Sequence, residues 1–218
     1  MENQYKIRSP FFYAVMRLIS NRAALVSGVL LFLIVLMAIF APLITATSYE
    51  EQKFLMNSLA FPSQTHWFGI DDLGRDLFSR IIYGARVSLT IGFAAAVCSV
   101  FIGLPLGALS GFYGGKVDWI IMRIIEVFSV VPPLIAALLL AALVDGGFFS
   151  IIFIAGIFGW VQVCLLVRAQ VMAFKEKEFI RSSLALGASP MYVIFVHLIP
   201  NSISPIIVGF VQAIPLVM

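Results

Sequence analysis

Long stretches without a charged residue alternate with short polar segments along this chain. A helix rises about 1.5 Å per residue, so roughly 20 apolar residues are needed to cross the hydrocarbon core of a membrane. By that measure the sequence predicts four complete spans, at residues 23–44, 87–109, 127–144 and 148–167, and a fifth that starts near Ile199 and ends with the chain at Met218. The pattern indicates an all-α, polytopic helical membrane protein with about five transmembrane helices, the last incomplete.

The distribution of lysine and arginine predicts how these spans are oriented. With the N-terminus in the cytoplasm, ten of these residues fall in inner segments and four in outer ones, as the retention of positive charge on the cytoplasmic side requires. The first apolar run is too long for the core of a signal peptide, so we expect an uncleaved anchor. The chain then divides into a cytoplasmic or interfacial segment at residues 1–22 and a transmembrane domain at 23–218, with an outer loop at 45–86 and a cytoplasmic loop at 168–198.

Composition agrees with a chain that lies in lipid. Hydrophobic residues make up 61% of the sequence and charged residues 11%, whereas about a quarter of the residues of a soluble domain are charged. The net charge is +3, but the basic residues lie at the ends of the spans rather than in one stripe, so nucleic acid is not an expected partner. Cys98 and Cys164 fall inside apolar stretches, where small packing residues are the expectation.

Groups that could supply energy or bond chemistry are missing from the expected positions. The sequence GFYGGKV at residues 111–117 resembles a phosphate-binding loop only faintly, because Ser110 replaces its first glycine and Val117 follows the lysine. The spans contain no chain of carboxylates or histidines for proton coupling, and His66 and His197 are predicted on opposite sides of the membrane. We therefore expect no metal, no cofactor and no enzymatic activity in this chain. Either another chain supplies the energy or the protein does not pump.

Small residues recur at every fourth position of the second span and so share one helical face. They are Ala95, Ser99, Gly103, Gly107 and Gly111. Such a stripe lets helix backbones approach closely in lipid, although glycine and alanine are also simply common in membrane helices. Pro105 and the pair Pro132 and Pro133 are expected to kink or interrupt their helices, with or without a role in gating.

The outer segment before the second span carries a helix-start signal. Asp71 or Asp72 is expected to cap an amphipathic helix, with Asp76 and Arg80 paired four residues apart. That helix would either meet an external partner at the membrane surface or serve a purely structural role. The acidic residues lack the spacing of a calcium-binding loop.

The segment at residues 178–201, EFIRSSLALGASPMYVIFVHLIPN, is the strongest functional candidate. It is polar and positively biased between charge-free stretches. Gly187 permits a backbone turn, and Ser189 with Pro190 restarts a helix with a cap and a proline in its first turn. Phe179, Leu184 and Leu186 are candidate apolar contacts. We expect this loop to dock onto a soluble partner; the alternative is an ordinary solvated connector.

Four stretches carry a family resemblance that covers nearly the whole chain: SNRAALVSGVLLFLIVLMAIFAPLI, HWFGIDDLGRDLFSRIIYGARVSL, GFYGGKVDWIIMRIIE and FIRSSLALGASPMYVIFVHLIPN. The chain resembles the second permease subunit of binding-protein-dependent ABC importers of the dipeptide, oligopeptide and nickel branch. The last stretch is similar to the EAA loop of that family. The resemblance implies two short helices that meet near a glycine, one of them seated in a groove of an ATPase subunit.

Carried over by position, the Glu-Ala-Ala start falls on Arg181, Ser182 and Ser183, the glycine on Gly187, and the closing proline on Pro200 beside Asn201. Arg181 departs from the family glutamate and reverses the charge offered to the partner. The implied coupling residues are Glu178, Phe179, Arg181, Ser182, Ser183, Leu184, Leu186, Gly187, Ala188, Ser189, Pro190 and Pro200.

The resemblance implies an inner-membrane permease that imports peptides, or nickel or another small solute. Its implied partners are a homologous permease, two cytoplasmic ATPases that bind ATP and Mg²⁺, an extracytoplasmic solute-binding protein and membrane lipid. Family members continue beyond the fifth span with an outer segment and a final helix. The sequence is therefore expected to be C-terminally truncated, which leaves open a split gene, an incomplete reading frame, or a non-functional or scaffold remnant.

Overall fold

The structure is a computed structural model that describes residues 16–45, 52, 58–143 and 147–217. The regular structure of these residues is helical, apart from one isolated antiparallel bridge between Ile70 and Asp76. This confirms the all-α class. The chain divides into two compact units, residues 1–87 and 88–218, which we describe separately.

The first unit contains the predicted first span. Helix α2 (Arg22–Ile39) begins at Asn21, whose side-chain oxygen accepts hydrogen bonds from the amides of Ala23 and Ala24 at 3.1 and 3.3 Å. Phe40 separates α2 from the short helix α3 (Ala41–Ile44), which has a proline in its first turn. The span at residues 23–44 is thus present with a break near its end. Nearly all α2 side chains are exposed, as expected of a helix that faces lipid.

The first unit also contains a compact segment at residues 66–80, which we call the polar knot. The Asp71 carboxylate accepts hydrogen bonds from the amides of Leu73 and Arg75 at 2.9 and 2.8 Å. It also pairs with the guanidinium groups of Arg75 and Arg80 at 2.9 and 2.6 Å. Burial by itself raises the pKa of Asp71, but these hydrogen bonds together outweigh it and lower the pKa from 3.8 to about 2.

The knot corrects two predictions about the start of helix α4 (Leu77–Tyr113). The side chain that caps the first turn belongs to Asp76, whose Oδ2 accepts from the Ser79 amide at 2.8 Å, and not to Asp71 or Asp72. Arg80 pairs with Asp71 rather than with Asp76, whose other oxygen lies 3.1 Å from Nδ1 of His66. The backbone turn at Gly74 brings Asp71 back toward the helix, which the sequence spacing did not reveal.

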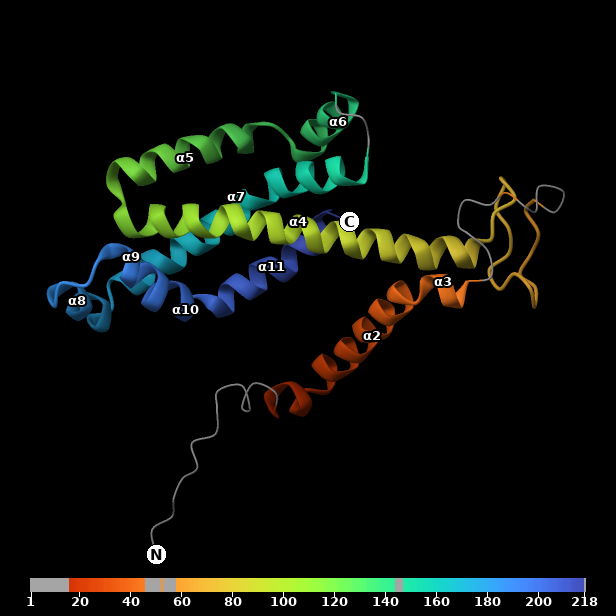
Figure 1. Cartoon of the computed structure of the whole chain (residues 1–218), viewed down its shortest axis with the longest axis horizontal. Helices are drawn as coiled ribbons and strands as arrows, with labels where there is room; N and C mark the ends of the chain where they lie inside the picture. Colours follow the sequence, from red (N-terminus) through yellow and green to blue (C-terminus); the bar gives the residue numbers. More distant parts are fainter. Residues whose placement is uncertain (1–15, 46–51, 53–57, 144–146, 218) are drawn as a thin grey trace, which may run out of the picture. The chain divides into compact units, whose positions relative to one another are not determined.

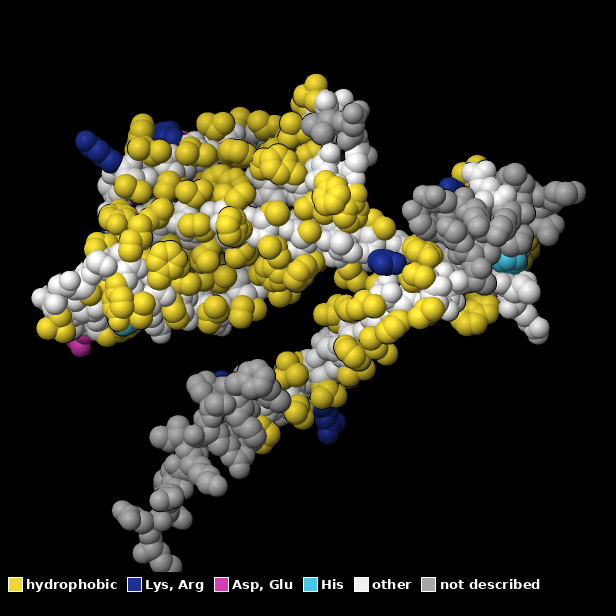
Figure 2. All heavy atoms as spheres, viewed as in Figure 1, with side chains coloured by type: hydrophobic (Ala, Val, Ile, Leu, Met, Phe, Trp, Pro, Cys, Tyr) yellow, Lys and Arg dark blue, Asp and Glu magenta, His cyan; other side chains and the backbone are white. Residues whose placement is uncertain are grey.

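The second unit is a helical bundle built on α4 and α7 (Phe148–Lys175), with α5 (Gly115–Val130), α6 (Pro133–Leu143) and α11 (Ile203–Val217) packed against α7 (Figure 1). The described residues contain three helices long and apolar enough to cross a membrane: α2, α4 and α7. A fourth candidate is a pair of segments, Pro190–Asn201 and Ile203–Pro215, bent by 68°. Hydrophobic side chains cover the visible face of the bundle in Figure 2.

The predicted third span at residues 127–144 is wrong as a single helix. Helix α5 ends at Val130 and α6 starts at Pro133, so the span is divided between two shorter helices. The cause is the proline pair Pro132 and Pro133, since neither residue can donate the backbone hydrogen bond that continues a helix. Pro105 does not interrupt its helix, since it lies inside α4; a kink at this position stays a prediction.

The small-residue stripe of α4, which the sequence suggested as a packing face, lies against α7. A methyl group placed on Gly103, Gly107 or Gly111 would lie 2.5 to 2.7 Å from a backbone carbonyl oxygen of α7. Those carbonyls belong to Trp160, Cys164 and Arg168, which are also four residues apart. At the other end of the stripe Ala95 and Ser99 are buried, and the Ser99 hydroxyl lies 3.3 Å from the Gly156 carbonyl. The two backbones therefore touch at the three glycines, over about two turns, and a side chain at any of these three positions would separate them.

Candidate functional site

The candidate site is the segment at residues 178–201, which we call the elbow. It contains helix α8 (Glu178–Ala185), a turn at Gly187, helix α9 (Pro190–Tyr192), the π-helical stretch η2 (Val193–Leu198) and α10 (Ile199–Asn201). Figure 1 shows α8, α9 and α10 together at one end of the second unit. The prediction of two short helices that meet near a glycine is confirmed.

Local chemistry explains the turn. The Gly187 amide donates to the Leu184 carbonyl at 3.0 Å and the Ala188 amide to the Ser183 carbonyl at 3.1 Å, the pair of hydrogen bonds that closes a helix on a left-handed residue. Gly187 has φ +88°, a conformation that side chains disfavour, yet open space surrounds it. The next helix restarts at Ser189, whose hydroxyl accepts from the Tyr192 amide at 3.3 Å, with Pro190 in its first turn.

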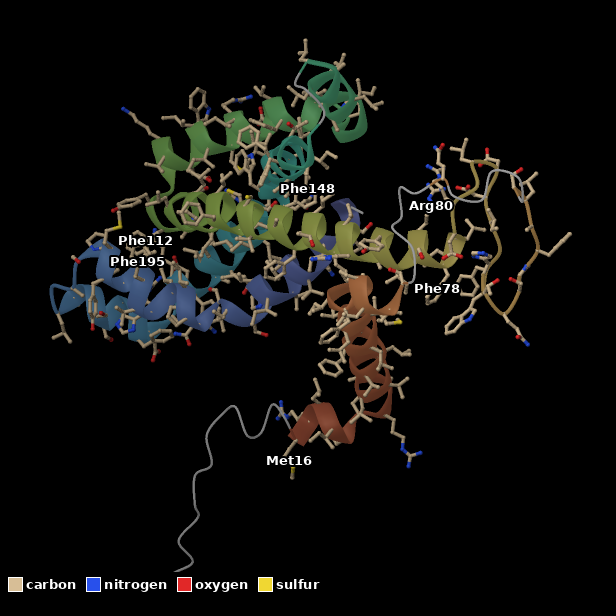
Figure 3. The ribbon with its side chains drawn as sticks, turned by 45° about the vertical axis from the view of Figure 1, so that its right-hand side comes forward. Met16, Phe78, Arg80, Phe112, Phe148 and Phe195 are labelled. Atoms are coloured by element: carbon tan, nitrogen blue, oxygen red, sulfur yellow. The ribbon has the colours of Figure 1, made fainter. Side chains whose placement is uncertain are left out.

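The inner side of the elbow is buried against the bundle. Ile180, Val193, Ile194 and Leu198 are each at most 2% exposed. They share one apolar cluster with Phe112 at the end of α4 and with Val167 and Val171 of α7. Figure 3 shows Phe112 near the elbow end of α4. Because packed interiors resist deformation, a displacement of the elbow must carry the ends of α4 and α7 with it.

The outer side of the elbow exposes apolar side chains. Leu186 is 89% exposed and Phe179 47%. Leu184 belongs to the inner side, since it is partly buried against the same cluster as Ile180, so it is not the outward contact that we expected. Met191, Tyr192 and Phe195 extend the exposed apolar surface beyond the turn. Met191, Tyr192 and Phe195 belong to the candidate membrane-spanning pair, whereas Phe179 and Leu186 lie before it, where an exposed apolar patch marks a surface that another molecule can cover.

The remaining candidates lie around this surface. Glu178, Ser182, Ser189 and Pro190 are exposed, as is Pro200, while Ser183 and Ala188 are half-buried. Arg181 is exposed and donates to the Glu176 carboxylate in an ion pair at the entrance of α8. Its positive charge is thus partly compensated within the chain.

Sequence reasoning missed a group of charged residues beside the elbow. Asp118 of α5 accepts two hydrogen bonds from the Arg168 guanidinium of α7, at 2.6 and 2.7 Å, and one from the Ser110 hydroxyl of α4 at 2.5 Å. Lys175, the last residue of α7, donates to the Phe112 carbonyl at 2.5 Å. The available signal was Asp118, a negative charge in a segment that otherwise carries positive charge. The spacing of residues does not connect it to Arg168, which lies 50 residues later.

Comparison with known proteins defines the class. Residues 103–218 match the family described as "Binding-protein-dependent transport system inner membrane component", and residues 9–62 match the "N-terminal TM domain of oligopeptide transport permease C". The first match includes helix α7 and the whole elbow. The chain belongs to the permease subunits of binding-protein-dependent ABC importers and is an inner-membrane protein.

Individual relatives agree with this membership. The chain is 42% identical over 202 residues to the oligopeptide transport system permease protein OppC of Bacillus subtilis, an alignment that covers 93% of this chain and 66% of the relative. It is 39% identical to the dipeptide transport system permease protein DppC of Alkalihalophilus pseudofirmus, over 98% and 71% of the two chains. The glutathione transport system permease protein GsiD of Pectobacterium atrosepticum is 32% identical, over 94% and 68%. The chain spans about two thirds of the length of these relatives.

Proposed function

We propose that this chain is the permease subunit of an ATP-driven importer and that its elbow receives motion from a separate ATPase subunit. One observation supports the proposal above all others. The elbow buries four large apolar residues against α4 and α7, and on its opposite side it exposes Leu186 and Phe179. A segment of this kind is suited to bind a partner on one side and to transmit force on the other.

The exposed side suits a groove on a soluble protein. Anchor residues of interfaces are large apolar side chains that enter a pocket and lose contact with water. Leu186 lies directly before the left-handed turn, so it occupies the apex of the elbow, and Phe179 lies about two helical turns earlier, in α8. Closure of two ATPases on ATP would move this apex and swing the helices that pack beneath it, as a two-state element requires.

The complete transporter in this proposal contains a homologous permease that lines the path together with this chain. It also contains two ATPases that hold ATP and Mg²⁺, and an extracytoplasmic protein that delivers the solute. This chain itself carries out no bond chemistry. Peptide is the preferred cargo, because relatives bear the names of oligopeptide, dipeptide and glutathione permeases, and glutathione is itself a short peptide.

The experiment compares two substitutions at the apex. Gly187→Val introduces a β-branched residue where φ is +88°, whereas Gly187→Asn introduces a residue that tolerates this conformation. Apart from the neighbouring residues, no atom of this chain lies within 4 Å of a Cβ at this position, so the two variants differ chiefly in how well they tolerate the backbone conformation. We expect Gly187→Val to lower ATP-driven peptide uptake in proteoliposomes by about tenfold or more, from a strain of roughly 1–3 kcal/mol, and Gly187→Asn to retain most of it.

A contact measurement accompanies the transport assay. Leu186→Cys on a Cys98→Ser background is expected to form a cross-link to the ATPase subunit, while a cysteine at the buried Ile180 is not. Equal uptake by both Gly187 variants, or no cross-link from the apex in a transporter that works, would refute the coupling role.

A further inference from the structure

Three side chains from three different helices meet beside the elbow. Asp118 of α5 receives both the Nε and the Nη2 hydrogens of Arg168 of α7, and its Oδ1 also accepts from the Ser110 hydroxyl of α4. We call Ser110, Asp118 and Arg168 the clasp. The two charged residues are 23% and 25% exposed, and Ser110 is buried.

The clasp is continuous with the packing under the elbow. Arg168 follows Val167, which lies in the same apolar cluster as Ile180 and Leu198 of the elbow. Arg168 is also the residue whose carbonyl lies against Gly111, where the backbones of α4 and α7 touch. About two helical turns after Arg168, Lys175 donates to the carbonyl of Phe112, another member of that cluster. The ends of α4 and α7 and the elbow are therefore held together by backbone contact, apolar packing and a hydrogen bond.

Helix α5 joins this group in a different way. Its residues Ile121 and Ile125 pack against Trp160 and Cys164 of α7. Apolar packing of this kind sets the position of α5 on α7 by shape alone, without an ion pair or hydrogen bond between the packed side chains. A bidentate arginine–carboxylate pair is directional and fixes both the register and the rotation of the helices that carry it. The clasp is the directional contact between α5 and the part of the bundle that bears the elbow.

We propose that the clasp is a positioning device that makes α5 move together with the elbow. This inference rests on the proposed function, because the movement in question is the one that the ATPase imposes. Without the Asp118–Arg168 pair, the elbow and α7 still move, but α5 no longer follows in register. ATP hydrolysis then continues while solute transport falls. Asp118 and Arg168 contact neither ATP nor solute in this scheme; they act through the helices that they join.

The test uses the assembled transporter in proteoliposomes with a dipeptide as the transported solute. The measured quantity is the number of peptides taken up per ATP hydrolysed. Asp118→Asn removes the charge from a side chain of the same shape, and we expect the ratio to fall about five- to tenfold, the lower range of typical coupling factors. Asp118→Glu keeps a carboxylate for the arginine fork and is expected to restore most of the ratio.

The matched control is Glu126→Gln on the same helix. Glu126 forms an ion pair with Arg123, but both side chains are more than half exposed. We expect its uptake per ATP to equal that of the original chain. The clasp proposal is overturned if Asp118→Asn matches this control, or if hydrolysis and uptake fall in equal proportion.

A second measurement distinguishes failure of the clasp from failure of the proposed function. Spin labels at Lys116→Cys on α5 and Lys177→Cys before α8, both exposed positions, report the distance between α5 and the elbow. On a Cys98→Ser background in nanodiscs, we expect one narrow distance distribution for the original clasp and a broadened one for Asp118→Asn. This readout needs no ATP. Narrow distance distributions in both the original chain and Asp118→Asn would refute the clasp. A broadened distribution in Asp118→Asn, together with no ATP-driven uptake by the original transporter, would refute only the proposed function.

Discussion

The elbow and the polar knot are two short, folded segments that adjoin long apolar helices, but they are held by opposite means. The inner side of the elbow consists of buried aliphatic residues such as Ile180 and Leu198. The knot is organised around two carboxylates, Asp71 and Asp76, that bind backbone amides, arginines and a histidine. Apolar packing depends on shape and hardly on pH or salt, whereas a carboxylate network depends on both. The two segments should therefore differ in how their stability responds to pH and salt.

The largest effect is expected inside the elbow. Ile180→Ala removes a side chain that is 0% exposed, so we expect a loss of about 2–5 kcal/mol in the free energy of unfolding. The measurement is thermal unfolding in detergent on a Cys98→Ser background, in which a thiol-reactive dye reports exposure of Cys164, a residue that is fully buried in the folded chain. Leu186→Ala, at an 89% exposed position, is the control and is expected to change stability by less than about 0.5 kcal/mol. Equal losses in the two variants would mean that the inner side does not anchor the elbow.

A smaller effect is expected in the knot. Asp71→Asn keeps the shape of the side chain but removes the charge that faces Arg75 and Arg80. We expect a local loss of about 1–3 kcal/mol, since partners of a buried acceptor are left poorly satisfied. The rate of limited proteolysis at residues 66–80 measures this loss. High salt should reduce the difference in cleavage rate between the original chain and Asp71→Asn. A salt-independent loss would show that packing, not charge, holds the knot.

The knot should also respond to acid. The pKa of Asp71 is about 2 in the folded chain against an ordinary 3.8, so its contribution is complete above about pH 5 and is lost as the pH falls through about 2. Trp67 packs on Phe78 with ring centroids 4.9 Å apart, so its fluorescence reports the fold of the knot. Trp119→Phe and Trp160→Phe leave Trp67 as the one tryptophan. In this chain we expect the Trp67 fluorescence to change between about pH 4 and pH 2, and we expect no such change when Asp71→Asn is added. A transition of equal size in both proteins would assign it to another group.

The smallest effect concerns the exposed ion pair at the entrance of α8. Glu176 and Arg181 are about two thirds exposed, at 65% and 68%. Glu176→Gln is therefore expected to change the free energy of unfolding by less than about 0.5 kcal/mol. The same dye assay measures it. A loss comparable with that of Ile180→Ala would mean that charge, and not apolar burial, sets the geometry of the elbow.

The parts of this structure that depend on local chemistry were predictable from the sequence. Gly187 and Ser189 with Pro190 specify a turn and a cap within a few residues, and both are present. The stripe from Ala95 to Gly111 indicated a close helix contact, although not that α7 is the partner. The orientation of the spans and the docking role of the elbow stay predictions.

The errors at Asp71, Leu184 and Asp118 share a physical cause, which is that the decisive partner is not the neighbour that sequence spacing suggests. The third span was wrong for a local reason, the proline pair between α5 and α6. Asp71 turns back onto Arg80 because of Gly74, so the simple rule of four-residue spacing picked the wrong pair. Leu184 faces inward because the bundle covers that side of α8. The clasp joins Asp118 of α5 to Arg168 of α7. From the sequence, Arg168 was used only as a positive charge at the end of a span, to predict orientation, and so no partner was sought for it.

The break between α5 and α6 has a consequence for how water and lipid meet this chain. Because Pro132 and Pro133 carry no amide hydrogen, the helical ladder cannot supply donors to the carbonyl oxygens of Phe128 and Ser129. Two strong acceptors are thereby offered in a stretch whose side chains are almost entirely hydrocarbon. In a bilayer such oxygens require water or another hydrogen-bond donor, so the proline pair places a demand for polar contacts inside an otherwise nonpolar stretch.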